Sequence, residues 1–155
     1  MELNMTNCPG VDCFTQESGE APLTESGIRL LVDRFYIKVR QDALLGPVFD
    51  RAIADDEWTE HLATMRDFWS SVMLTSGRYH GNPVAAHRRL DGIKPAHFER
   101  WLALFRETCR ELFGDETAAT FQDKAQRIAT SLQLALFYRP EDDLRAPQGK
   151  HAGRA

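Results

Sequence analysis

Residues 58–72, WTEHLATMRDFWSSV, decide the fold. Their apolar members return every three or four positions, at Trp58, Leu62, Met65, Phe68, Trp69 and Val72. This period is typical of an α-helix with one buried face. His61 has i, i+4, i+8 spacing with Met65 and Trp69, so an imidazole shares the apolar face with two core side chains. The stretch therefore predicts an inward-facing helix that carries a polar group.

The helical period continues on both sides of this stretch, and no alternating run predicts a strand. We therefore expect an all-α protein. Capping residues, glycines and prolines set the expected boundaries. The first helix should begin after Thr24 or Ser26 and end before Gly46-Pro47, and the second should begin after Asp55 and end near Gly77. A short third helix should begin at Asn82-Pro83 and end at Gly92. The fourth should end at Gly114, and the fifth should run from Asp115 to Pro140.

The chain is long enough for one hydrophobic core and too short for two. It has 155 residues, of which 43% are hydrophobic. We expect one globular domain at residues 23–139. Residues 1–22 and 140–155 show no sustained period, and we expect a flexible leader and a flexible tail there.

Charge and targeting signals argue against several classes of protein. The chain has 19 basic and 23 acidic residues, a formal net charge of -4, and no basic block in its helical part that suits a nucleic-acid partner. Its first residues, Met1-Glu2-Leu3-Asn4, lack the features of a secretory signal, and no apolar run approaches about 18 residues. We expect a cytoplasmic protein without a membrane partner.

The three cysteines cannot all pair, so reduced thiols are expected. Cys109 falls in the apolar stripe of a helix and should lie in the core. Cys8 and Cys13 lie in the leader, where a metal or redox role stays open.

Several polar side chains fall on inward helix faces. Tyr36 borders the stripe of the first helix, His61 lies on the second, and Trp101 lies on the fourth. Each alone is an ordinary core residue, but together they need a common partner, because a buried polar group without a hydrogen bond is costly. A bound cofactor supplies one. His87, on a short helix, suits the axial ligand of a haem iron.

Other uses of the histidines stay open. A structural zinc site could combine His61, His80 and His87, but the spacing is loose and no fourth ligand is evident. His80 and His97 are otherwise expected to be solvated. A helical interaction domain without haem would instead pair its buried polar groups with each other.

The order and spacing of seven strings resemble the group III truncated haemoglobins over about residues 24–138. The strings are RFYIKVR at 34–40, LGPVF at 45–49, WTEH at 58–61, FWSS at 68–71, RYHGNP at 78–83, AHRRL at 86–90 and FERWLALF at 98–105. The resemblance implies a truncated globin, in which a two-over-two helical sandwich encloses haem b (iron protoporphyrin IX). The leader before Thr24 fits a family whose first globin helix is largely missing.

The resemblance also implies roles for individual residues. His87 becomes the proximal iron ligand. Tyr36, His61 and Trp101 become the distal residues that face the bound gas. Phe49 would pack on the haem face, and Met65 and Trp69 would line the pocket. Tyr79 and Arg88 or Arg89 would approach the haem propionates.

This reading predicts binding of O2, NO or CO at an iron that His87 alone can hold. A hydrogen bond from Tyr36 or Trp101 to a partly charged O2 is worth roughly 1.5–3 kcal/mol, and the slow release that follows suits oxygen transport poorly. The alternative is a haem enzyme, an NO dioxygenase, nitrite reductase or peroxidase-like protein, supplied with electrons by a reductase. The protein is expected to be a monomer or a weak dimer.

Overall fold

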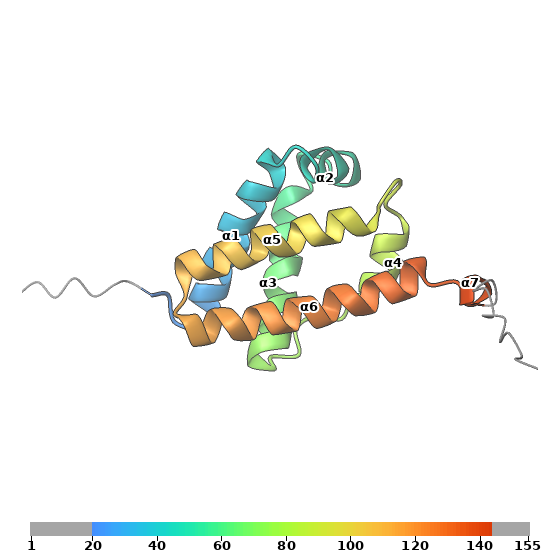
Figure 1. Ribbon diagram of the computed structural model, residues 1–155. Helices are drawn as coiled ribbons and strands as arrows, with labels where there is room; N and C mark the ends of the chain where they lie inside the picture. The colour runs from blue at the N-terminus through green and yellow to red at the C-terminus, as the bar shows by residue number, and fades with distance from the viewer. Residues whose placement is uncertain (1–19, 144–155) are drawn as a thin grey trace, which may run out of the picture.

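The computed structural model describes residues 20–143, which form helices and no strand (Figure 1). The prediction of an all-α protein is confirmed for this part of the chain. The helices are α1 (Glu25–Gln41), α2 (Gly46–Ala52), α3 (Trp58–Leu74), α4 (Pro83–Arg88), α5 (Pro95–Leu112), α6 (Asp115–Phe137) and α7 (Pro140–Asp143). None of the helices in residues 20–143 is long and apolar enough to cross a membrane.

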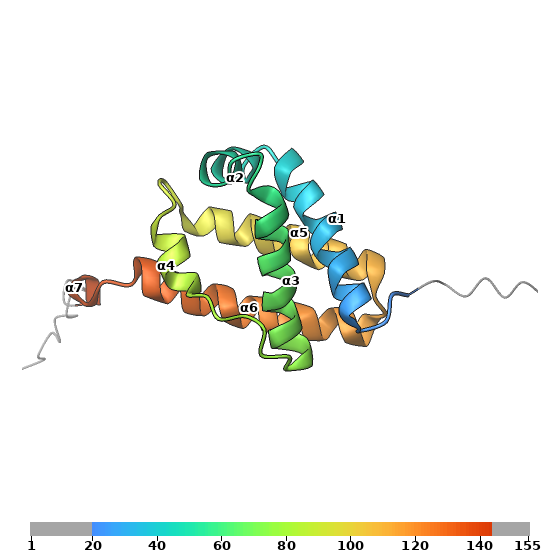
Figure 2. The ribbon, with the colours of Figure 1, turned by 180° about the vertical axis from the view of Figure 1, so that it is seen from behind.

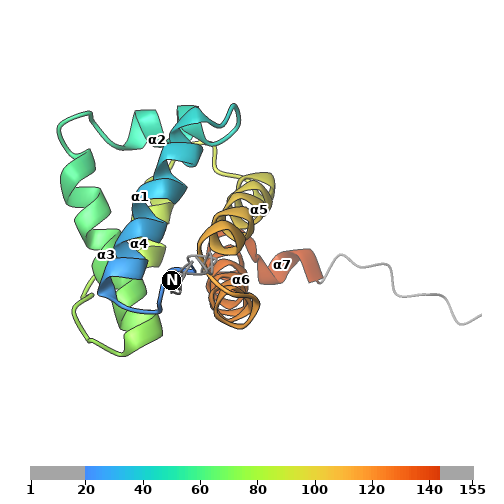
Figure 3. The same ribbon diagram turned by 90° about the vertical axis from the view of Figure 1, so that its left-hand side faces the viewer.

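The helices form two facing pairs. α1 packs on α3, and α5 packs on α6, while α1 also contacts α5 and so joins the pairs. Figure 3 shows α1 and α3 on one side and α5 and α6 on the other. α2 packs on α1, and the short α4 packs on α6, near the end of α6 that leads to α7 (Figure 2).

The core lies where the two pairs meet. The stripe predicted for the first helix is almost completely buried, at Ile28, Leu31, Val32, Phe35 and Val39. Phe105 of α5 and Phe121 of α6 meet it from the other pair. Cys109 is fully buried as expected, and burial raises the pKa of its thiol to about 12, which leaves it unreactive at neutral pH.

Two predicted helix starts are confirmed by their hydrogen bonds. Thr24 Oγ1 accepts a hydrogen bond from the Gly27 backbone N–H at 3.3 Å. Asn82 Oδ1 accepts one from the Ala85 N–H at 3.1 Å, directly before Pro83 at the first position of α4. Both side chains satisfy backbone donors that have no partner inside the helix.

The chain between the first two long helices differs from expectation. Gly46-Pro47 was predicted as a break, but it begins α2, because proline is well accepted in a first helical turn where its missing N–H costs nothing. Asp55 was predicted to cap the next helix. It does not, because α3 begins three residues later, at Trp58, and the Glu57 carboxylate accepts from the Ala54 N–H at 3.0 Å.

The turn between α5 and α6 also differs. Asp115 was predicted as a cap but is the first residue of α6, and Gly114 takes the cap position with φ −61° and ψ 161°. α5 already ends at Leu112, because Phe113 turns into the core and its ring stacks on Phe121 at 4.8 Å. An acidic residue in a first turn is still favourable, since it faces the positive end of the helix dipole.

Some predictions concern residues that lie outside the described part. Cys8, Cys13 and most of the expected leader belong there, as does the expected tail after residue 143. The first four residues of that tail form α7.

Replacing Gly27 by Ala is expected to destabilise the protein, although alanine is normally the better helix former by about 0.5–1 kcal/mol. A Cβ at position 27 would overlap the Pro22 carbonyl and press on the Phe113 ring. Overpacking of this kind costs about 1–3 kcal/mol, which urea denaturation would measure. Ser26→Ala, at the neighbouring exposed position, is the control and should change little. A Gly27→Ala protein as stable as the original would contradict this reading.

Candidate functional site

Tyr36 and His61, predicted from helical phase to face inward, lie against each other. Tyr36 of α1 is 5% exposed, and its ring centroid is 5.0 Å from that of His61 of α3, with the rings perpendicular. Phe49 of α2 completes the group, at 5.9 Å from Tyr36 and 6.4 Å from His61. We call Tyr36, Phe49 and His61 the distal cluster.

Trp101 joins this cluster through one further ring. Its indole stacks on Phe105 at 5.0 Å and meets the edge of Phe35 at 5.1 Å. Phe35 is also 5.1 Å from Tyr36. Met65 follows His61 by one turn of α3 and is half-buried against the core. The structure therefore brings Tyr36, His61 and Phe49 into contact, and it connects Trp101 to them through Phe35.

The polar atoms of these residues have no protein partner. His61 Nε2 is buried without a hydrogen bond. Neither the Tyr36 hydroxyl nor the Trp101 indole N–H forms a hydrogen bond with any residue in 20–143. A buried atom such as His61 Nε2 is costly unless something else bonds it, so the arrangement suits a polar or polarisable ligand.

Burial also sets the charge of these side chains. It raises the pKa of the Tyr36 hydroxyl well above its ordinary value, so the hydroxyl keeps its proton and remains a donor. It lowers the pKa of His61, so the imidazole is neutral at neutral pH. The distal cluster thus offers neutral donors and one neutral imidazole.

His87 lies apart from this cluster, on α4. Its Nδ1 is 2.7 Å from the Pro83 carbonyl oxygen, and its ring stacks loosely on Phe98 at 5.9 Å. A carbonyl only accepts, so Nδ1 carries the proton and Nε2 keeps its lone pair. Metal-ligating histidines are commonly oriented in this way by a hydrogen bond at the other nitrogen.

Many apolar side chains that pack against the core are only half-buried. They come from five helices and from the segment before α5, and include Phe49, Leu62, Met65, Phe68, Val72, Val84, Ile93, Trp101, Leu102, Ile128 and Leu136. α3 and α4 are not in close backbone contact. Cofactor sites have such apolar walls with a few placed polar groups, so the residues fit an iron porphyrin with an imidazole on one side and polar groups on the other.

Of the residues expected near the haem propionates, Tyr79 lies in the segment between α3 and α4, and Arg88 and Arg89 lie at the end of α4. The Tyr79 ring lies 5.1 Å from that of Phe68, and its backbone N–H donates to Ser71 Oγ at 2.9 Å. Arg88 and Arg89 are exposed and form no ion pair with a described residue. Their guanidinium groups are therefore available to an anionic group such as a carboxylate.

The remaining histidines lie elsewhere. His80 is exposed, as expected. His97 is half-buried rather than solvated, because its Nδ1 accepts a hydrogen bond from the Lys94 N–H at 2.9 Å in the first turn of α5. Within residues 20–143 no three histidine, cysteine, aspartate or glutamate side chains group as metal ligands, so the zinc alternative with His61, His80 and His87 finds no support.

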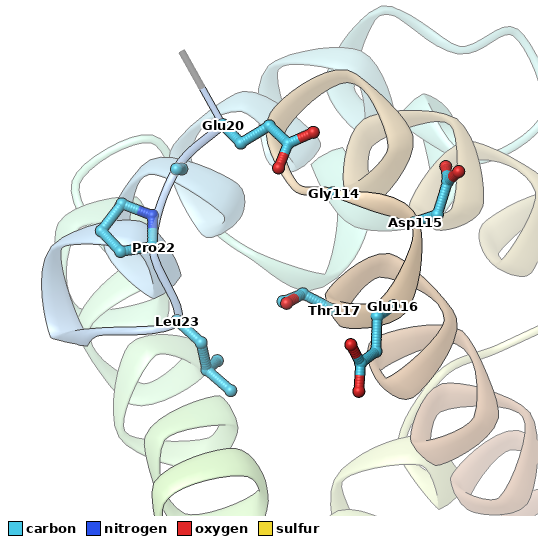
Figure 4. A pocket seen from close by; sticks show the side chains of 8 residues that line it. Glu20, Pro22, Leu23, Gly114, Asp115, Glu116 and Thr117 are labelled. Atoms are coloured by element: carbon cyan, nitrogen blue, oxygen red, sulfur yellow. The ribbon is translucent and has the colours of Figure 1, made fainter. Parts of the chain in front are cut away.

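An open pocket of about 420 Å³ lies away from these residues, between the segment before α1 and the turn from α5 to α6 (Figure 4). Its side chains include the carboxylates of Glu20, Asp115 and Glu116. All three are exposed, and no buried polar group points to a ligand there.

Sequence reasoning missed the role of one further residue. Trp58 was placed only in the apolar stripe, yet its indole Nε1 is buried without a partner, like His61 Nε2. The i, i+3 spacing of Trp58 and His61 was a signal that the two share a helix face.

Comparison with known proteins supports the fold and shows the family. No protein-family model matches the sequence. The chain is 37% identical over 117 residues to a curated protein described as "Group 3 truncated hemoglobin ctb" from Campylobacter jejuni. The match covers 74% of this chain and 92% of that protein. The crystal structure of a group III truncated haemoglobin from Campylobacter jejuni superposes with a TM-score of 0.71 and 36% identity, over 75% of this chain and 93% of the other.

These matches confirm the resemblance carried by the seven sequence strings and the two-over-two truncated globin fold. Globins are haem proteins, and the donor set around His61 and His87 fits that cofactor. The chain belongs to the group III truncated haemoglobins.

Proposed function

We propose that this protein binds haem b through His87 and holds a diatomic ligand, O2, NO or CO, on the opposite side, next to Tyr36, His61 and Trp101. One observation carries the proposal. The Tyr36 hydroxyl, the Trp101 N–H and His61 Nε2 all lack partners, while the hydrogen bond to Pro83 leaves His87 Nε2 free.

Different side chains would hold different parts of the cofactor. Haem iron, when bound, supplies the coordination position for the gas. His87 Nε2 ligates the metal, and Phe49 and Met65 provide apolar contact on the side of the distal cluster. Tyr79 and the exposed Arg88 are proposed to meet the propionates, and Arg89 is a second candidate cation.

Tyr36 is proposed as the strongest donor to the ligand. Its hydroxyl keeps its proton because burial raises the pKa. A hydrogen bond to a partly charged acceptor contributes about 1.5–3 kcal/mol, and Trp101 would give the second. His61 is proposed to act as a gate, and it is also placed to serve as an alternative iron ligand.

A second candidate function is favoured by the state of His61. Its imidazole is neutral and its buried Nε2 is unpaired, so it can accept or relay a proton. This suits an enzyme that acts on nitric oxide, nitrite or peroxide with electrons from a reductase. Turnover of these substrates by the reduced protein would distinguish catalysis from plain binding.

Replacing His87 by Ala should remove the normal iron coordination, because no other described histidine lies at that place. The absorption spectrum of the purified ferric and ferrous protein is the measurement, and loss or displacement of the Soret band is expected. His80→Ala, which changes an exposed histidine in the segment between α3 and α4, should leave the spectrum unaltered. An unaltered spectrum for His87→Ala would remove the proximal assignment.

Replacing Tyr36 by Phe should speed release of O2 by about tenfold or more, since the ring is kept and only the hydroxyl is lost. Stopped-flow displacement of O2 by CO measures the rate. Tyr138→Phe is the matched control, because Tyr138 is exposed, directly follows α6 and lies outside the distal cluster. An off-rate that stays the same in Tyr36→Phe would refute the role of the hydroxyl.

The buried His61 should make stability depend on pH. Its pKa is lowered in the folded state, so below about pH 6.5 the unfolded chain takes up a proton that the folded chain refuses. Stability should then fall with pH, by at most about 1.4 kcal/mol per unit from this group. Urea denaturation from pH 7.5 to 5.5 tests this as a difference from His61→Gln, which lacks the group. Equal slopes for both proteins would show that His61 is not held neutral.

A further inference from the structure

Trp58 is the first residue of α3, and the roles proposed above leave it unused. It is 6% exposed, and its indole N–H is buried without a partner. A buried tryptophan N–H usually has a hydrogen-bond partner, so the unbonded donor of Trp58 calls for one beyond the described residues.

The indole touches every member of the distal cluster. Its ring centroid lies 5.5 Å from His61 and 6.0 Å from Tyr36, both edge to face. It lies 6.4 Å from Phe49, nearly parallel. A movement of Trp58 would therefore first displace the His61 imidazole and the Tyr36 phenol, which are proposed to face the ligand.

Arg40 of α1 holds Trp58 from the solvent side. Its guanidinium carbon is 4.5 Å from the centre of the indole, at cation–π distance, and its side chain is 45% exposed above the buried ring. The same guanidinium lies 3.5 Å from the Asp55 carboxylate, in the segment that leads into α3. The contact thus joins the end of α1 to the start of α3.

Among residues 20–143, no other cation–π contact holds the first turn of α3. Glu57, at its cap position, makes no side-chain hydrogen bond to the helix. His61 lies one turn further along, so its place depends on how firmly Trp58 is held.

We propose that Arg40 and Trp58 form a clamp that positions His61 in the distal cluster and slows the passage of ligand. Trp58 is a positioning residue in this clamp, and its N–H donates to a small polar molecule, water or the ligand itself, that also bonds His61 Nε2. The inference rests on the proposed ligand-binding function.

The test uses the haem-loaded ferrous protein with CO. Arg40→Gln removes the cation from the ring and should raise the rate of CO association about two- to fivefold, the range expected for one exposed cation–π contact. It should also shift the NMR signals of the His61 ring in the CO-bound protein. Arg34→Gln, an exposed arginine of α1 without an ion pair to a described residue, is the matched control and should change neither.

Trp58→Phe keeps an aromatic ring and removes the N–H together with one of the two fused rings. It should shift the C–O stretching band, which responds to hydrogen bonding near the ligand, while the helix content by circular dichroism stays constant. If Trp58→Phe does not fold, Arg40→Gln decides the matter, because Arg40 is partly exposed.

The outcomes separate this inference from the proposed function. If Arg40→Gln leaves the CO rate and the His61 signals unchanged while Tyr36→Phe still speeds O2 release, the clamp is wrong and the ligand site stands. The proposed function itself fails if the protein shows no Soret band with haem or if His87→Ala leaves the absorption spectrum unaltered, and the clamp proposal then fails with it.

Discussion

The stack of rings around Phe105 is the contact on which the arrangement of helices depends. Phe105 of α5 stacks on Trp69 of α3 at 4.7 Å and on Trp101 of its own helix at 5.0 Å, and it meets the edges of Phe35 and Phe121. One side chain therefore links α1, α3, α5 and α6. α3 is fastened to the α5–α6 pair at Trp69, eight residues after His61. The start of α3, with Trp58 and His61, instead contacts the rings of Tyr36 in α1 and Phe49 in α2.

The apolar core and the unpaired polar atoms therefore lie in different parts of the structure. The rings around Phe105 are nearly all fully buried and carry no unpaired polar atom in their deepest part. The unpaired atoms of Trp58 and His61 lie near the start of α3, where Leu62, Met65 and Phe68 are also only half-buried. A bound cofactor and ligand would relieve both defects together, and binding to the folded state alone would add stability in proportion to its affinity.

Local chemistry explains how much of this could be predicted from the sequence. The caps Thr24 and Asn82 act on backbone N–H groups three residues away, so a short string reveals them. Helical phase placed Tyr36 and His61 inward for the same reason. Asp115 is not the cap of α6, because the burial of Phe113 against Phe121 ends α5 early and moves the start of α6. α2 was missed because Gly46-Pro47 is equally suited to ending one helix and to starting another.

The contact between Arg40 and Trp58 shows the limit of such reasoning. The two residues are 18 positions apart and belong to different helices, so their contact depends on the angle at which α1 and α3 cross, which no period in the sequence gives. A sequence pattern can say that a side chain faces inward, but not which neighbour it meets. For His61 the neighbours decide the chemistry: a wet surface would leave the imidazole to titrate near its ordinary value, whereas the rings of Tyr36, Phe49 and Trp58 desolvate it and keep it neutral. The distal cluster is thus a tertiary property built from residues whose types, but not whose contacts, the sequence reveals.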